Sequence, residues 1–155
     1  MAEKYGFGAI EDGLVTLLNT NIATINTGLS RTVKKIATLK PDNIVLKIPE
    51  YPAICVYFDF ADRDFRGASK RIETIGRYRI DYWTHDRYSI DATKDQADLL
   101  ADNLLYVLDS NIDISNFYAA KGYILAKGIR YDYNTNDSGF ITHGVIELEV
   151  RRYQN

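Results

Sequence analysis

The sequence has little cysteine, histidine and proline, and it contains no long hydrophobic run. Its single cysteine, Cys55, cannot form an internal disulfide, which fits a reducing compartment. Two histidines are too few for the usual zinc sites, which need several ligands at recognised spacings. No stretch approaches the roughly 18 apolar residues of a membrane-spanning helix, and residues 1–6 are too polar for a signal peptide. We therefore expect a soluble protein that is not secreted by that route and has no membrane partner.

An excess of charge of one sign is also lacking. The chain has 19 lysines and arginines against 21 aspartates and glutamates, for a net charge of -2. No global positive field exists to attract nucleic acid or an anionic membrane. Any such partner would need a local basic patch.

Apolar and aromatic residues, in contrast, are plentiful. The 155 residues are 46% hydrophobic and 12% aromatic. A chain of this length is close to the usual size of one domain, and this composition can fill its core. We expect a single domain over residues 1–155 and exclude disorder for most of the chain.

The first helical pattern covers residues 9–39, where apolar residues recur about every three or four positions. It predicts an amphipathic helix that stops before Pro41. Lys34 and Lys35 would lie near its end, where they complement the helix dipole. Asn, Thr and Gly residues up to Gly28 are poor helix formers, so we expect the helix to be kinked or divided near that glycine. A second amphipathic helix is predicted over residues 93–110.

The second helix has two candidate N-caps. Thr93 with Gln96 fits a capping box, and Asp91 is the alternative. Each candidate cap predicts a different first residue for this helix.

Alternating apolar residues predict strands before and after the second helix. They cover residues 44–48, 54–60, 72–84, 122–133 and 140–152. On the second of these, Phe60 is expected to share one face with Ile54, Val56 and Phe58. Connections between strands are too short for crossovers. The sequence predicts an α+β fold, with a mostly antiparallel sheet, two amphipathic helices packed on it and a long β-hairpin arm.

Candidate catalytic groups are few. His85, with Asp81 before it and Asp86 after it, is the closest approach to a metal or acid/base site, but a solvated strand end is the favoured interpretation because strand neighbours alternate faces. His143 precedes Gly144 at a strand entry, and we expect it to have no nearby acid or thiol partner. Cys55 has apolar neighbours that raise its thiol pKa, so we expect a buried structural role. We predict no catalytic residue, no metal site, no cofactor and no enzymatic activity.

A nucleic-acid-binding sheet is a further hypothesis. Arg77, Arg79, Asp81 and Trp83 are expected on one strand face, and Tyr131 and Tyr133 on another strand. Aromatic stacking beside basic residues is how single strands are held. The acidic net charge favours a protein interface instead, since Tyr, Trp and Arg are enriched in contact surfaces and the chain has twelve tyrosines.

Several segments together resemble the bacteriophage tail terminator proteins, also called tail completion or neck proteins. The N-terminal amphipathic pattern is followed by PAICVYF at residues 52–58, a charged loop, and YRIDYW at residues 78–83. A helix containing Ala97 and Leu104 and the strand GVIELEV at residues 144–150 complete the order. The resemblance spans nearly the whole chain.

The resemblance implies a structural virion protein. Members form hexameric rings on the end of the tail tube, stop its polymerisation and offer a surface to the head connector, while genomic DNA passes through the lumen without specific binding. The implied partners are further copies of the chain, the tail tube protein and the head connector or neck proteins. The implied location is the tail or neck of the virion, after assembly in the host cytoplasm. A head–tail adaptor or stopper ring is the nearest alternative.

The charged stretch at residues 62–71 mixes both signs, as expected of a segment that pairs with a complementary neighbour, or of a solvated loop. A ring contact needs two different patches on each subunit. This hairpin and the edge of the C-terminal hairpin are the candidates. The predicted interface residues are Arg63, Asp64, Phe65, Arg66, Lys70, Arg71, Asn136 and Asp137.

Overall fold

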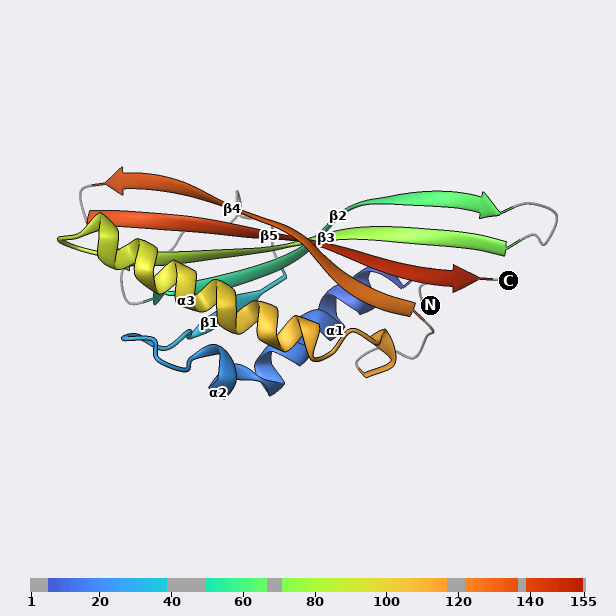
Figure 1. Ribbon diagram of the computed structural model, residues 1–155, viewed down its shortest axis with the longest axis horizontal. Coiled ribbons are helices and arrows are strands. Elements are labelled where there is room, and N and C mark those ends of the chain that lie inside the picture. The colour runs from blue at the N-terminus through green and yellow to red at the C-terminus, as the bar shows by residue number, and fades with distance from the viewer. Residues whose placement is uncertain (1–5, 39–49, 67–70, 117–121, 137–138, 155) are drawn as a thin grey trace.

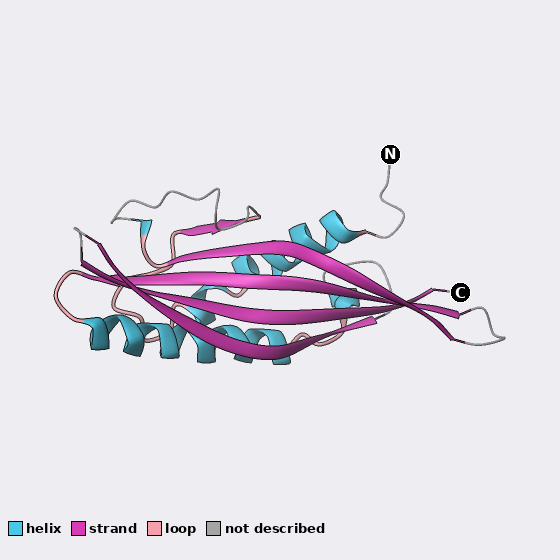
Figure 2. Cartoon of the chain, turned by 90° about the horizontal axis from the view of Figure 1, so that it is seen from above, coloured by secondary structure: helices cyan, strands magenta, loops and turns pink. Residues whose placement is uncertain are grey.

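The computed structural model describes residues 6–38, 50–66, 71–116, 122–136 and 139–154. Its strands are β1 (Lys35–Ala37), β2 (Ala53–Arg66), β3 (Arg71–Asp86), β4 (Gly122–Asn136) and β5 (Gly139–Gln154). Its helices are α1 (Phe7–Thr20), α2 (Ile22–Ile25), α3 (Ile90–Asp109) and the short 3-10 helix η4 (Ile114–Asn116). The helices lie on one side of a five-stranded sheet (Figures 1 and 2). The predicted α+β class is confirmed.

The sheet consists of two long hairpins joined side by side. Its strand order is β1-β2-β3-β5-β4, and every neighbouring pair is antiparallel except β1 with β2. Both predicted hairpins are confirmed. Pairing continues to Arg66 opposite Arg71 in the first hairpin and to Asn136 opposite Gly139 in the second. The strands therefore extend into both the charged stretch predicted as a long tip and the segment predicted as a turn. The seam between β3 and β5 fixes the two hairpins relative to each other.

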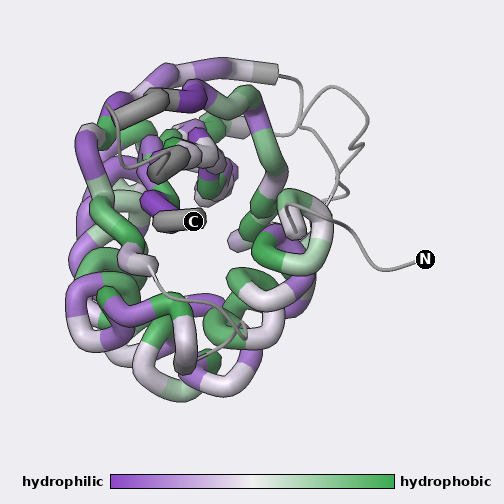
Figure 3. The backbone as a smooth tube through the Cα atoms, turned by 90° about the vertical axis from the view of Figure 1, so that its right-hand side faces the viewer, coloured by the Kyte–Doolittle hydropathy of each residue, from purple (hydrophilic) through white to green (hydrophobic). Residues whose placement is uncertain are grey.

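The core lies between the helices and the sheet face that they cover. Leu14 and Leu18 of α1 and Leu100 and Leu104 of α3 are fully buried there. Three alternate residues of β3, Tyr78, Ile80 and Tyr82, point into the same core, as the period-2 pattern predicts. In the end-on view of Figure 3 the strands curve over the helices, and hydrophilic and hydrophobic residues alternate along the tube.

The prediction of one helix over residues 9–39 is wrong. Helix α1 ends at Thr20, α2 is one short turn, and Lys35 belongs to strand β1. Gly28 has a φ of 74°, a left-handed conformation that ends helical geometry. The chain is then held in a loop, because Asn26 Oδ1 accepts a hydrogen bond of 2.7 Å from the Val33 amide. The lysines predicted to complement the helix dipole therefore lie beyond it.

Helix α3 begins three residues earlier than predicted, and neither candidate cap is used. Ser89 is the N-cap, and its hydroxyl accepts a hydrogen bond from the Ala92 amide. Gln96 instead accepts a hydrogen bond of 2.9 Å from the Ser30 amide, which ties the loop after α2 to α3. Thr93 bonds Thr142 of β5 through its hydroxyl at 2.7 Å. The strand predicted over residues 44–48 lies outside the described residues.

A β-bulge in β2 overturns the predicted orientation of Phe60. Pairing with β3 skips Asp59, so Phe58 faces Tyr78 and Phe60 faces Arg77. Phe60 is consequently 49% exposed on the far side of the sheet rather than in the core. At the bulge, the Phe58 amide donates a hydrogen bond of 2.8 Å to Glu11 of α1, which fastens this helix to the sheet.

Candidate functional site: the outer face of the sheet

The sheet face opposite the helices, here called the outer face, is dominated by charged and aromatic side chains. On β3 it carries Arg77, Arg79, Asp81 and Trp83, which alternate with the core residues of that strand. These four residues share a face, as predicted. The neighbouring strands place complementary charges beside them because the register sets Arg77 opposite Glu149 of β5.

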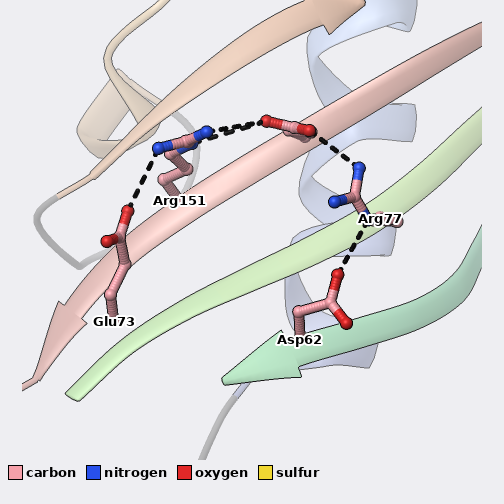
Figure 4. Close-up of polar contacts among 5 residues, drawn as sticks. Asp62, Glu73, Arg77 and Arg151 are labelled. Atoms are coloured by element: carbon pink, nitrogen blue, oxygen red, sulfur yellow. Dashed lines mark hydrogen bonds and ion pairs between the residues drawn. The ribbon is translucent and has the colours of Figure 1, made fainter. Parts of the chain in front are cut away.

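A continuous chain of ion pairs crosses this face (Figure 4). Arg77 contacts Asp62 of β2 at 3.0 Å through Nε and Glu149 at 2.7 Å through Nη1. Arg151 contacts the other oxygen of Glu149 at 3.2 Å and Glu73 at 3.4 Å. The side chains of Glu73 and Glu149 are 1% and 8% exposed. The two arginines thus neutralise carboxylates that are largely withdrawn from water.

Burial by itself would raise the pKa of Glu149, but hydrogen bonds from Arg77 and Arg151 outweigh it and hold this pKa below the usual value of 4.5. A depressed pKa in the folded state stabilises the protein above the unfolded-state pKa, and the stabilisation disappears as the pH falls through the folded-state pKa.

Replacing Glu149 by glutamine should therefore weaken the acid dependence of stability. We expect the gap in the free energy of unfolding between the wild type and E149Q to be widest above about pH 5 and to shrink below about pH 4. Urea denaturation at several pH values measures it. Glu147→Gln is the control, since the Glu147 side chain is 53% exposed. A gap that is constant with pH would contradict the prediction.

A second cluster on the outer face is centred on the fully buried Asp81. Its Oδ2 lies 2.8 Å from Nε2 of His143 and 3.5 Å from Nη2 of Arg79. The His143 ring stacks on Trp83 with centroids 4.9 Å apart, and Nδ1 lies 3.9 Å from the exposed Asp132. The expectation that His143 has no acid partner is wrong. Its partner comes from β3, and local sequence gives no sign of the pairing between β3 and β5.

Cys55 lies beside this cluster, in register with Asp81. Burial raises the pKa of its thiol to about 12, with further contributions from the charges of Asp81 and Glu11. The thiol is therefore protonated near neutral pH, and the predicted structural role is consistent with this.

His85 does not form the constellation weighed from the sequence. Its ring stacks on Tyr51 at 5.3 Å, and Asp86 instead accepts hydrogen bonds from the Tyr88 and Ser89 amides. Asp81 is engaged by His143. Within the described residues, no group of three or more His, Cys, Asp or Glu side chains is placed to hold a metal ion.

A shallow hollow of about 290 Å³ lies where the two β-bulges face each other. Asp59 and Phe60 border it from β2, and Lys127 from β4. The guanidinium of Arg77 lies over the Phe60 ring at 5.4 Å, while its nitrogens bind carboxylates. The hollow is lined by charges of both signs and gives no preference for an anionic ligand.

The tyrosines of the nucleic-acid hypothesis are not on the outer face. Tyr131 packs edge-on against the core residue Tyr82, and Tyr133 packs against Tyr131. They therefore lie on the helix side of the sheet, opposite Arg77 and Arg79. The expected combination of these two tyrosines with Arg77 and Arg79 is not formed. Other rings do lie beside the arginines on the outer face, since the Arg79 guanidinium lies over the Tyr57 ring at 5.3 Å.

The predicted interface residues fall at two opposite ends of the sheet (Figure 1). Arg63, Asp64, Phe65 and Arg66 end β2, and Arg71 begins β3, so they share one hairpin end. Arg63 is exposed, whereas Lys70 lies outside the described residues. Asn136 is the last residue of β4 at the other end, and Asp137 lies outside the described residues. The hairpin residues are brought together, and Asn136 is not brought to them.

No protein-family model and no curated protein matches the chain. Among solved structures, it is similar to a chain described as "Virion of native gene transfer agent (GTA) particle". The two are 11% identical, the TM-score is 0.49, and the match covers 98% of this chain and 100% of the other. None of the described helices is long and apolar enough to span a membrane.

Proposed function

We propose that this chain is a structural subunit of a phage-type virion, a tail terminator that forms a ring, caps the tail tube, stops its polymerisation and joins the tail to the head connector. The proposal combines the sequence resemblance with one structural observation. The two ends of the sheet are unlike, so that each subunit carries two different contact surfaces. A ring built from heterologous contacts requires such a pair.

The first end is the charged end of the β2–β3 hairpin, here called the arm and defined as residues 62–66 and 71–73. It extends beyond the helices in Figure 1. The opposite end carries exposed apolar groups, since Tyr88 is 81% exposed, Ile90 40% and Tyr133 46%. Apolar groups left in water are typical of contact sites, and tyrosine is enriched in interfaces.

The charges of the outer face favour a structural role in which genomic DNA moves past the protein without binding to it. Its arginines Arg77, Arg79 and Arg151 already contact carboxylates. Each free basic contact to a phosphate adds affinity, so a self-neutralised face allows genomic DNA to slide in a lumen without specific binding. The proposal needs no cofactor.

The experiment that tests the proposal is the mass of the purified protein by light scattering, combined with negative-stain images and with mixing with its tube protein. We expect a closed ring of about six subunits, or ring formation on tube ends, and shorter tubes when the protein is added during polymerisation. A monomer that neither binds tube ends nor changes tube length would overturn the proposal.

The same mixtures separate the nearest alternative, a head–tail adaptor or stopper ring of the neck. A terminator binds the ends of tail tubes in the absence of other neck proteins. An adaptor binds the head connector first and leaves free tubes to elongate. The order of binding in pull-downs with each purified partner distinguishes the two.

Reversing charge in the arm should weaken assembly and leave the subunit folded. We expect the double variant R66E/R71E to lower the ring population about tenfold or more, since like charges then meet at a complementary contact. Light scattering measures assembly, and circular dichroism checks the fold. The control R66K/R71K keeps the charges and should assemble normally. Unchanged assembly of R66E/R71E would remove the arm from the interface.

A further inference from the structure

One long edge of the sheet has no partner strand among the described residues. Strand β4 (orange in Figure 1) is last in the sheet order, and beyond its bridge at Tyr123 it pairs there only with β5. Residues 129–135 of this strand are called here the β4 edge. All of them except Tyr131 are exposed. Unpaired strand backbone of this kind is a template for an added strand.

The ladder with β5 shows which backbone groups of the β4 edge point outward. The Ile124 amide points away from β5, because it donates a hydrogen bond of 2.7 Å to the Ile112 carbonyl. In an antiparallel pair every second residue has this orientation, and the register carries the pattern past the bulge at Lys127. The outward amides and carbonyls of the β4 edge are therefore those of Ile129, Tyr131, Tyr133 and Thr135.

The side chains of these alternate residues lie on the helix side of the sheet, where Tyr131 packs on the core residue Tyr82. Helix α3 covers them only in part, since Ile129 is 42% exposed and Tyr133 is 46% exposed. Apolar groups in water beside unpaired strand backbone are typical of a site that binds an extended segment.

The flank of α3 beside the β4 edge is acidic. The pKa of Asp98 is held below its usual value chiefly by Lys94 and in part by Tyr131, so this carboxylate faces the β4 edge. Burial raises the pKa of Tyr82, with further contributions from the charges of Asp98 and Asp102. Asp102 therefore lies on the same flank. Lys94 pairs with Asp98 at 2.8 Å, whereas the exposed Asp102 has no cationic partner within the described residues.

The basic residues of β4 point to the other side of the sheet. Arg130 contacts Glu147 at 3.5 Å on the outer face, and Lys127 borders the hollow on that face. A strand added to the β4 edge would thus meet apolar groups and a carboxylate on its helix side. The complementary segment carries apolar and basic side chains at every second position.

The described strands of the chain itself cannot fill this site in a ring. Strands β2, β3 and β5 are paired on both sides, and β1 has only three residues, Lys35–Ala37. Pairing of β4 with β4 of a second copy is an isologous contact, which closes as a dimer.

We propose that the β4 edge binds an extended segment of a partner protein as a sixth strand, with the apolar and basic side chains of that segment facing α3. The inference goes beyond the proposed ring function and does not depend on it. The outward backbone groups supply the hydrogen bonds, while Ile129 and Asp102 select the side chains.

A synthetic peptide tests the proposal. It has threonine at every odd position and lysine and valine in turn at the even positions, so that lysine and valine face α3 and their amides face β4. Fluorescence anisotropy of the labelled peptide should show binding to the wild type. N-methylation of the lysine and valine amides should weaken binding about tenfold or more, because it removes the donors to β4. The matched control is N-methylation of the threonine amides, which point away and should leave binding nearly unchanged.

Variants of the protein test the side-chain contacts. Ile129→Lys and Asp102→Lys should each weaken peptide binding about fivefold or more, since each brings a positive charge to a basic ligand. Phe60→Lys is the control for the first, because Phe60 is 49% exposed but lies on the outer face. Asp12→Lys, at an exposed position of α1, is the control for the second. Circular dichroism checks that all four variants fold.

Amide hydrogen exchange measured by NMR distinguishes strand addition from a loose charge contact. Peptide binding should slow exchange at the four outward amides, which are those of Ile129, Tyr131, Tyr133 and Thr135. The amides between them already bond to β5 and should change little.

The outcomes separate this inference from the proposed function. No binding by the wild type, equal binding by both N-methylated peptides, or binding without the alternate exchange pattern would overturn the strand addition. Outward amides that are already protected without peptide, together with loss of rings in Ile129→Lys, would assign the β4 edge to a second copy and also overturn it. A chain that binds the peptide as expected but never caps tubes would overturn the ring function alone.

Discussion

Replacing Gly144 by alanine is expected to lower the free energy of unfolding by about 3 kcal/mol. Gly144 of β5 lies opposite Tyr82 of β3, and a Cβ at this position would overlap the Tyr82 ring. The ring cannot move aside easily, because Tyr82 is fully buried and packs against Tyr131. Thermal unfolding followed by circular dichroism should show a drop in Tm of roughly 10 °C for a chain of this length.

Gly128→Ala is the matched control on the neighbouring strand. A Cβ at Gly128 would meet nothing within 4 Å, so we expect a change in Tm of about 1 °C or less. In a double-mutant cycle, Gly144→Ala should cost less stability in a Tyr82→Leu background than in the wild type, because the smaller side chain leaves room for the new methyl group. A Gly144→Ala protein as stable as the wild type would contradict the packing of this ring on the glycine.

Replacing Asp81 by alanine should be nearly as damaging, with an expected loss of about 3 kcal/mol in the free energy of unfolding. The carboxylate is fully buried and accepts from His143 at 2.8 Å, with Arg79 at 3.5 Å. Its removal takes this acceptor from His143 and Arg79, whose side chains are only 18% and 24% exposed. Chemical denaturation of the purified variant measures the loss.

Asp62→Ala is the control for this change, since the Asp62 side chain is 54% exposed and its pair with Arg77 should contribute no more than about 1 kcal/mol. Asp81→Asn keeps the shape and removes the charge, and we expect its stability to fall between those of the wild type and the alanine variant. Equal stability of the two alanine variants would show that the Asp81 cluster does not stabilise the fold.

Much of the fold could be predicted from local pattern. Period-2 alternation identified both hairpins and the core face of β3, since each face of a strand repeats every second residue. The pattern failed where local geometry interrupts it. The bulge at Asp59 reverses the face of Phe60, and polar residues before Gly28 end a helix whose apolar spacing continues beyond them.

The outer-face clusters could be predicted only in part. Alternation placed Arg77, Arg79 and Asp81 together because all three belong to one strand. The partners Glu149 and His143 lie on β5, which follows β3 only after α3 and β4. Their positions depend on a register between strands distant in the sequence, and a single sequence gives no signal for it. The interface residues chosen from charge pattern remain predictions.

The seam between β3 and β5 also determines how the chain can fold. Each hairpin joins strands that are consecutive in the sequence, so its loop-closure entropy is small. The seam joins strands separated by α3 and β4 and has to form against a larger entropy. Helix α3 packs on both β3 and β5, so we expect its docking to bring the two hairpins together during folding. Substitutions on the buried face of α3 should therefore slow refolding more than substitutions in either hairpin turn.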